Sequence, residues 1–480
     1  MPRSRQAPPR GLPGPRSSER NFSGRNFTIP EINTDYLQEL RELPMRKCIL
    51  LAVSALAFGC GNSSFQNFLQ NPPFFAVGTT RVSVDSSGVE GNGLSVETAF
   101  SADARFVAFV SAANNLVAND TNNQEDIFVH DRQTGVTTRV SLDSNGAQAN
   151  SVSDSPYLSG DGRFVAFDSN ASNLVANDNN GSRDVFVHDR QTGITTRVSL
   201  DSSGVEGNDE SFDPIISPDG RFVAFTSDAS NLVANDTNGV GDVFVHDRET
   251  GTTTRVSVDS GGVEGNFVSA FPSMSADGRL IAFRSLADNL VANDTNGAFD
   301  IFVHDRQTGT TTRVSVDSAG VEADSDSEEA NFSADGRFVA FESDATNLVA
   351  NDTNNDEDVF VRDLQTNTTT RVSLNAGGAQ ANGPSFRPWL SADGRFVAFE
   401  SQGSDLVAND TNGNIDVFVR DLQNGTNFRA SIDSNGAEAN SFSGQPVLSA
   451  DGLAVVFVSA ASNLVPNDTN GVFDIFVNQR

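Results

Sequence analysis

Seven loops of this chain share one arrangement of oxygen-bearing side chains, Asp-x-Asn-x-x-x-Asp. Calcium prefers several oxygen ligands from a flexible loop, and alternating carboxylate and amide groups supply them. The motif therefore predicts calcium as a cofactor, although the bidentate glutamate of a complete calcium loop is missing. The residues are Asp120, Asn122, Asp126, Asp178, Asn180, Asp184, Asp236, Asn238, Asp242, Asp294, Asn296, Asp300, Asp352, Asn354, Asp358, Asp410, Asn412, Asp416, Asp468, Asn470 and Asp474.

Turn chemistry is the alternative explanation of the same motif. The residue after each Asn is Gly or Asn, which is typical of a backbone position with positive φ. Side-chain hydrogen bonds of an Asx turn are then sufficient to explain the polar residues. Both interpretations stay open at this point. The residues after the Asn are Asn123, Gly181, Gly239, Gly297, Asn355, Gly413 and Gly471.

Catalytic chemistry is not indicated elsewhere in the sequence. We find no Ser/His/Asp constellation, no phosphate-binding glycine loop and no unique carboxylate pair. The acidic residues recur with the repeats, which argues against one asymmetric active site. The histidines occupy one repeat position and are replaced there in other repeats, which predicts a structural role. That position holds His130, His188, His246, His304, Arg362, Arg420 and Asn478.

The N-terminal region contains a pattern typical of export. Residues 45–60 begin with Arg46 and Lys47, continue with an apolar stretch too short to cross a bilayer, and end at Cys60. This resembles a bacterial lipoprotein signal, which implies acylation of Cys60. An ordinary secretory signal is the alternative. Because the only other cysteine is Cys48, no disulfide framework is expected.

The segments around this signal have no periodic pattern. Residues 1–44 are rich in Arg and Pro, and we interpret them as a misassigned upstream extension or a disordered segment. Residues 61–77 would be a tether. Residues 78–480 carry the repeats.

A period of 58 residues positions all these motifs. A repeat of that length with strand-like content predicts a propeller or array rather than one globular core. Its anchor is an Asp before a tight turn, at Asp103, Asp161, Asp219, Asp277, Asp335, Asp393 and Asp451.

Each repeat predicts four strands, which we name A to D, and the second repeat illustrates them. Strands B (163–167) and C (184–188) are apolar on both faces, as expected between neighbouring sheets. Strand A (155–159) is short and precedes the turn. Strand D (195–200) alternates, so we expect it to be outermost, with Arg197 on a wet face that discourages edge pairing. The long B–C and D–A loops should share one face of the disc.

The runs Asp-Gly-Arg-Phe-Val-Ala-Phe, Asp-Val-Phe-Val-His-Asp and Thr-Arg-Val-Ser resemble the TolB-type, WD-like propeller repeat. The resemblance covers residues 78–480. It implies an all-β, seven-bladed propeller of four-stranded antiparallel blades. The family includes scaffolds, binding modules and propellers attached to hydrolases or lyases, and none of its catalytic residues has a counterpart here.

The ends of the repeat region predict how the ring closes. The chain ends after strand C of the last repeat, so the seventh blade lacks a strand D of its own. Residues 79–84 match a strand D and precede the first complete repeat. We therefore expect this N-terminal strand to complete the C-terminal blade and remove the exposed sheet edges.

Charge and location together suggest a function. The chain has 63 acidic against 32 basic residues, a net charge of −31, which disfavours nucleic acid and favours an envelope protein or cationic ligand. We predict a monomeric, non-enzymatic binding or scaffold propeller of the bacterial cell envelope, lipid-anchored and periplasmic or cell-surface. Its only membrane contact would be the anchor. The alternative is an envelope lyase or hydrolase using the central channel, where strand A differs between repeats at Tyr157, Ile215, Ser273, Asn331, Trp389 and Val447.

Overall fold

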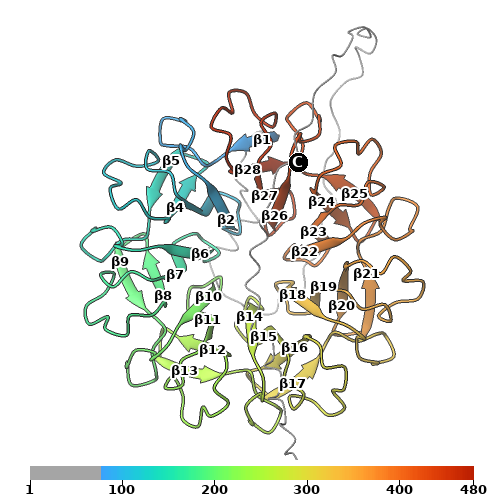
Figure 1. Ribbon diagram of the computed structural model, residues 1–480, viewed down its shortest axis with the longest axis horizontal. Helices are drawn as coiled ribbons and strands as arrows, with labels where there is room; N and C mark the ends of the chain where they lie inside the picture. Colours follow the sequence, from blue (N-terminus) through green and yellow to red (C-terminus); the bar gives the residue numbers. More distant parts are fainter. Residues whose placement is uncertain (1–76) are drawn as a thin grey trace, which may run out of the picture. The chain divides into compact units, whose positions relative to one another are not determined.

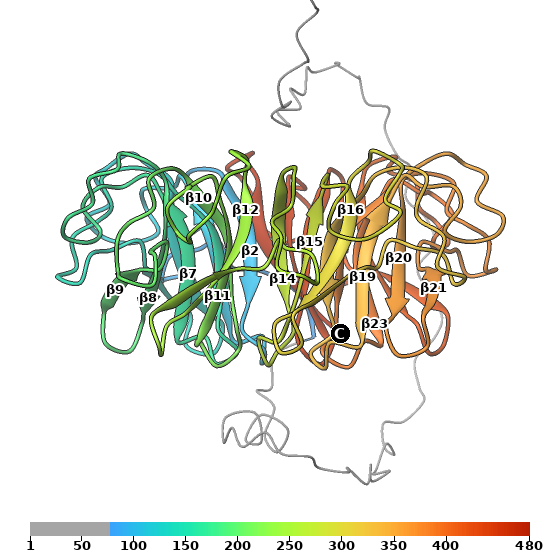
Figure 2. The ribbon, with the colours of Figure 1, turned by 90° about the horizontal axis from the view of Figure 1, so that it is seen from below.

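A computed structural model describes residues 77–480, and these form seven four-stranded antiparallel sheets around one axis (Figure 1). Within this range every regular element is a β-strand. We number the sheets as blades 1 to 7 in the order of their inner strands. The blades stand upright between two layers of loops (Figure 2). The all-β, seven-bladed propeller predicted from the sequence is confirmed.

The strands have nearly the same bounds in every repeat. Blade 1 contains β2 (Ser95–Phe100), β3 (Phe106–Ser111), β4 (Asp126–Asp131) and β5 (Val136–Arg139). Blades 2 and 3 contain β6 (Ser153–Leu158), β7 (Phe164–Ser169), β8 (Asp184–Asp189), β9 (Ile194–Arg197), β10 (Ser211–Ile216), β11 (Phe222–Ser227), β12 (Asp242–Asp247) and β13 (Thr252–Arg255). Blades 4 and 5 contain β14 (Ser269–Met274), β15 (Leu280–Ser285), β16 (Asp300–Asp305), β17 (Thr310–Arg313), β18 (Ser327–Phe332), β19 (Phe338–Ser343), β20 (Asp358–Asp363) and β21 (Thr368–Arg371). Blades 6 and 7 contain β22 (Ser385–Leu390), β23 (Phe396–Ser401), β24 (Asp416–Asp421), β25 (Thr426–Arg429), β26 (Ser443–Leu448), β27 (Ala454–Ser459), β28 (Asp474–Gln479) and β1 (Gly78–Arg81).

Blade 7 closes the ring as the sequence predicts. Its strand order is β1-β28-β27-β26, with Gly78 opposite Gln479 and Arg81 opposite Phe476. Val82 follows β1, is almost fully buried, and belongs to the core cluster that contains Ile475 and Val477. Because the first and last strands lie in one sheet, apolar burial and backbone hydrogen bonds both hold the ring closed.

The core lies between blades rather than within one. Strands B and C are buried on both faces, and each blade stacks a phenylalanine of strand B on one of strand C. In blade 2 the rings of Phe167 and Phe186 have centroids 5.8 Å apart. Each apolar cluster draws residues from adjacent blades, as Ala166 and Phe225 do. The prediction that strands B and C are sandwiched is confirmed.

The predicted wet face of strand D is wrong. The Arg197 side chain is 8% exposed and turns inward, where it pairs with Asp184 and Glu206. Thr195 is also buried, while Thr196 is exposed. Strand D does alternate as predicted. Its polar side faces inward, because the arginine forms ion pairs there with carboxylates of the same blade.

The predictions for residues 1–44, the signal at 45–60 with Cys60, and the tether up to residue 76 lie outside the described residues. Among residues 77–480, no helix is long and apolar enough to cross a membrane.

Candidate functional site

The B–C loops form the Asx turns that were one of the two interpretations of the motif. In blade 3 the Asn238 side-chain oxygen accepts a hydrogen bond from the Val240 amide at 3.1 Å, and Gly239 has a φ of 68°. The same side chain donates to Asp242 Oδ2 at 2.9 Å. The residue after the Asn has positive φ in all seven repeats, as predicted.

The strand-D arginine lies at the centre of each B–C carboxylate group. In blade 3, Arg255 Nη1 is 3.3 Å from Asp236 Oδ1, 3.0 Å from Asp242 Oδ2 and 2.7 Å from Glu264 Oε2. Asp242 is buried and also accepts a hydrogen bond from Ser257 Oγ at 2.5 Å. The chain itself thus supplies a cation to these acids. The equivalent arginines are Arg81, Arg139, Arg197, Arg313, Arg371 and Arg429.

Three of these acidic groups could hold a metal ion, because their oxygens lie within 4.8 Å of one another. They are Glu90/Asp468/Asp474, Asp178/Asp184/Glu206 and Asp236/Asp242/Glu264. An ion there would share its ligands with the arginine. Calcium as the particular metal, and the loop residues as its ligands, stay a prediction.

The four histidines have the structural role predicted for them. His188 is buried, and its Nδ1 lies 2.9 Å from Thr195 Oγ1 on strand D. The same contact recurs at His130, His246 and His304. Burial lowers the pKa of His130 to about 4, so the ring is neutral at pH 7. Each histidine fastens strand C to strand D.

The inner strands contain a second repeated feature, which the sequence interpretation missed. Each strand A has a bulge, where one residue takes a positive φ of 50–53° although it is not glycine. These bulge residues are Glu97, Ser155, Asp213, Phe271, Glu329, Arg387 and Gln445. Two residues earlier every repeat has a buried serine. The bulge residues, in contrast, differ between almost all blades.

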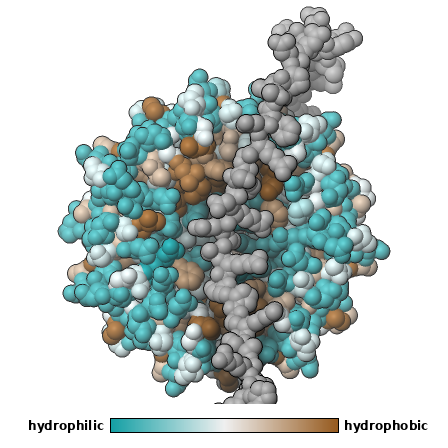
Figure 3. Space-filling model, in the orientation of Figure 1, coloured by the Kyte–Doolittle hydropathy of each residue, from teal (hydrophilic) through white to brown (hydrophobic). Residues whose placement is uncertain are grey.

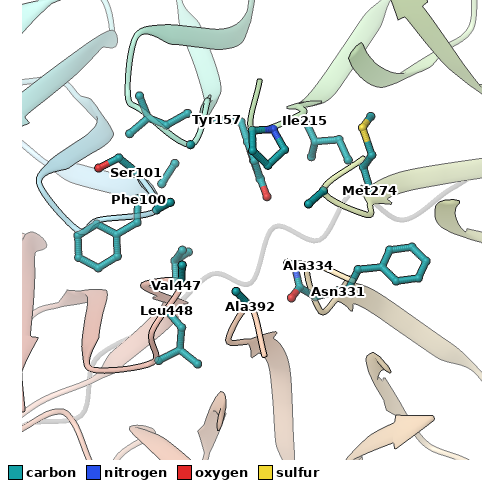
Figure 4. A pocket seen from close by; sticks show the side chains of 18 of the residues that line it. Phe100, Ser101, Tyr157, Ile215, Met274, Asn331, Ala334, Ala392, Val447 and Leu448 are labelled. Carbon is teal, nitrogen blue, oxygen red and sulfur yellow. The ribbon is translucent and has the colours of Figure 1, made fainter. Parts of the chain in front are cut away.

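The bulge residues line a cavity on the propeller axis. It encloses about 340 Å³ and is bounded by all seven inner strands. Strand A runs from the D–A loop to the A–B turn. The bulge residues lie in its first half, so this cavity lies toward the long loops. A smaller cavity of about 150 Å³ lies toward the A–B turns (Figure 4). Only the larger one reaches the size typical of ligand pockets, roughly 300–1,000 Å³.

An aromatic pair marks the waist between the two cavities. Tyr157 of β6 and Trp389 of β22 come from opposite sides of the ring, and their ring centroids are 6.2 Å apart. Both residues line both cavities, as do Ile215, Asn331 and Val447. These are strand-A positions at which the repeats were seen to differ. The larger cavity therefore has an aromatic floor.

Behind the bulges lies a polar cluster that is not repeated. The interpretation that the acidic residues recur with the repeats is wrong for these positions. Its members come from blades 2, 4, 5 and 6. The ring brings together positions of neighbouring blades that are far apart in the chain, such as Arg284 and Glu328. The cluster contains Asp154, Asp168, Glu328, Glu342 and Glu400, with Arg183 and Arg284.

Strand-B side chains of this cluster hold the bulges of the next blade. Asp168 Oδ2 accepts a hydrogen bond from the Asp213 amide at 3.2 Å, and Glu400 Oε1 accepts one from the Gln445 amide at 2.6 Å. Glu342 Oε2 does the same for the Arg387 amide at 2.5 Å. The strained backbone at the cavity wall is therefore stabilised by strand-B side chains whose residue type differs between the repeats.

Burial shifts the titration of these carboxyl groups toward neutral pH. It raises the pKa of Asp168 to about 8, despite the guanidinium of Arg183 at 3.5 Å. Burial, and then the charge of Glu329 of blade 5, raise the pKa of Asp213 to about 6. Burial also raises the pKa of Glu342, Glu400 and Glu97.

A comparison of the seven repeats with one another could have found this site. Aligned at the period of 58, the bulge column reads Glu, Ser, Asp, Phe, Glu, Arg, Gln, and the strand-B column Val, Asp, Thr, Arg, Glu, Glu, Val. Both columns vary between the repeats, unlike the serine that begins strand A, which is the same in all seven. Their position at one cavity required the ring geometry.

The face in view in Figure 3 is mostly hydrophilic, with apolar residues scattered over it. Scattered apolar residues are normal for a protein surface.

Fold and site together define the chain as a seven-bladed β-propeller of the kind that the TolB-type resemblance predicted. No protein-family model matches the chain, and no curated protein matches its sequence. Among solved structures, an oligogalacturonate lyase in complex with manganese is 14% identical, covers 84% of this chain and 92% of its own, and has a TM-score of 0.50.

Two further solved structures are similar to the chain at lower TM-scores. An oligogalacturonate lyase from Vibrio parahaemolyticus is 12% identical, with 84% and 93% of the two chains covered and a TM-score of 0.48. A putative TolB from Agrobacterium tumefaciens is 16% identical, with 72% and 94% covered and a TM-score of 0.38. At these identities the likeness concerns the fold.

Proposed function

We propose that this chain is a non-enzymatic binding propeller whose ligand site is the larger axial cavity. One observation carries the proposal: the residues that wall this cavity all come from strand A and mostly differ between the repeats, whereas the B–C loop motif is the same in all seven. A ligand of the repeated loops would meet seven equivalent sites. Only on the axis do all blades contact one ligand, so only there does blade-specific variation produce one specific site.

The surroundings of the cavity support a cationic ligand or partner. The B–C and D–A loops lie on the same side as the cavity and carry many of the chain's acids. Outward-facing acids attract cations and basic protein surfaces and repel phosphates. We propose a monomer that acts at the bacterial cell envelope, anchored through Cys60, with no nucleic-acid partner.

An envelope lyase or hydrolase is the second candidate, and a specific observation favours it. The pKa of Asp213, on the cavity wall, is raised to about 6 by burial and by the charge of Glu329. A carboxyl group that titrates near neutrality in a cavity is suited to general acid–base catalysis. The backing groups Asp168 and Glu342 are shifted in the same direction.

Calcium binding is a further proposal for the three acidic groups of the B–C loops. Calcium at about 100 times its dissociation constant would add roughly 2.7 kcal/mol per independent site. Chelation should then lower the melting temperature. Identical melts with calcium and with chelator would mean that the arginines alone satisfy these carboxylates.

Ligand-induced stabilisation of the purified full chain tests the binding proposal. The panel contains basic peptides, neutral glycans and uronate oligomers, and each mixture is analysed for turnover after the melt. A binding protein raises its melting temperature with one ligand class and leaves that ligand intact. Steady consumption of a ligand, lost in Asp213→Asn with the fold preserved, would favour the enzyme instead.

A further inference from the structure

The acidic side chains that line the larger axial cavity have few hydrogen-bond or ion-pair partners. Glu97, Asp213 and Glu329 line it, and none of them forms an ion pair with a described residue. Glu97 accepts a hydrogen bond from the Ser155 amide at 2.8 Å, and Asp213 a long one from Ser155 Oγ at 3.5 Å. These two carboxylates are therefore only partly satisfied, and Glu329 supplies a third acid.

The arginines nearby are already engaged. Arg387, the one cation among the described residues of the cavity wall, lies 3.5 Å from Glu400 Oε1. Arg284 pairs with Glu328, and its guanidinium lies 4.2 Å and 4.8 Å from the ring centroids of Phe271 and Phe299. Among the described lining residues, the three acids Glu97, Asp213 and Glu329 outnumber the one arginine, Arg387, whose charge also interacts with that of Glu329. The cavity therefore has an excess of acidic over basic groups.

The floor of the cavity favours a ligand with an apolar stem and a charged group. Tyr157 and Trp389 present aromatic rings at the waist, and Phe271 lies on the wall. Aromatic rings attract organic cations and pack against alkyl chains. Because the aromatic pair narrows the axis, a ligand would enter from the loop side and end there.

We infer that the larger axial cavity binds one alkyl-linked cationic group, a guanidinium or primary ammonium such as ends an Arg or Lys side chain. This inference rests on the proposed binding function. The cation lies among Glu97, Asp213 and Glu329, and its stem packs on the aromatic floor. The cavity of about 340 Å³ accepts a side chain and excludes a folded domain. A basic peptide segment presented to the loop face is the matching partner.

Trp389 is the only tryptophan of the chain and reports directly on this cavity. Tryptophan fluorescence of the full chain is titrated with agmatine as the cationic probe. n-Butylurea serves as a neutral probe of similar shape and galacturonate as an anionic one. We expect a saturable change with agmatine only, and a weaker affinity at higher salt.

Two charge-matched variants separate a local from a general effect. Glu329→Gln should weaken agmatine binding about tenfold. Glu249→Gln removes the same charge from an exposed C–D turn and should leave the affinity within twofold. Thermal melts of both variants within a few degrees of the parent show that the fold is kept.

Each outcome decides the inference. Saturable binding of galacturonate or n-butylurea instead of agmatine would overturn the cationic assignment while the axial binding site stands. Equal weakening by both variants would mean general charge attraction and would also overturn it. No saturable change with any probe would overturn the assignment, and the ligand panel above would then decide separately whether the propeller binds at all.

Discussion

Arg255 is the cation that neutralises the acids of one B–C loop, so its replacement tests whether the repeated motif is structural. In Arg255→Gln, the carboxylates of Asp236 and Asp242 lose a partner at 3.3 and 3.0 Å, and Glu264 loses one at 2.7 Å. The Arg255 side chain is 8% exposed, and Asp242 is buried. Water can therefore replace few of these contacts.

The expected loss follows from this burial. Removing one partner of a buried ion pair costs about 3–5 kcal/mol, because the other charge stays buried and unpaired. The folded region has about 400 residues, for which the entropy of unfolding is about 0.85 kcal/mol per degree. Each kcal/mol then lowers the melting temperature by about 1.2 °C, and the variant should melt about 4–6 °C lower.

A calorimetric melt at pH 7 measures this, with Arg221→Gln of the same blade as the control. Arg221 forms a bidentate pair with Asp247 at 3.0 and 2.7 Å, but its side chain is 39% exposed. Asp247 is buried, but water reaches it from the side of the exposed arginine and replaces part of the lost contact. The control should therefore lose only about 1–2 kcal/mol and melt about 1–2 °C below the parent. A small shift in Arg255→Gln, or an equal shift in both variants, would refute the structural role of the buried arginine.

Three more predictions concern stability. Val82→Ala, at the ring closure, should lower the free energy of unfolding by about 2–3 kcal/mol, about as much as Val198→Ala in blade 2. A much smaller loss for Val82→Ala in urea unfolding would mean that closure is dispensable. Asp168 binds its proton more tightly when folded, so it should destabilise the fold progressively from about pH 4 to pH 8, and the parent should lose up to about 1.4 kcal/mol per pH unit more than Asp168→Asn; parallel stability curves would contradict this. Gly220→Ala places a Cβ 2.3 Å from the Phe164 ring at a φ of 76° and should lower the melting temperature clearly more than Gly239→Ala, which has a similar φ but open space around it.

Much of the fold could be predicted because the period of 58 residues records it directly. The anchor Asp before each turn, the doubly apolar strands B and C, and the unpaired strand at residues 79–84 each have one structural solution. Strand D showed where such patterns mislead. The alternation around Arg197 gives two faces but not which one is buried, since that depends on acids contributed by the loops.

The axial site could not be derived in the same way. Asp168 and Asp213 are 45 positions apart and belong to different blades, so no local motif links them. The repeated Asp and Asn residues indicate a site in the B–C loops, but the acids of these loops are largely neutralised by arginine. The specific chemistry lies in what does not repeat, and only the closed ring shows that those positions converge.

The central claim is that function resides in the axial cavity and not in the repeated loops. It is tested by the melting shift that the best ligand of the panel induces, measured in two charge-matched double variants. The account predicts that Glu97→Gln/Glu329→Gln removes the shift, while Glu206→Gln/Glu264→Gln, in the loops, preserves it. A shift that survives in the cavity variant and disappears in the loop variant would contradict the account.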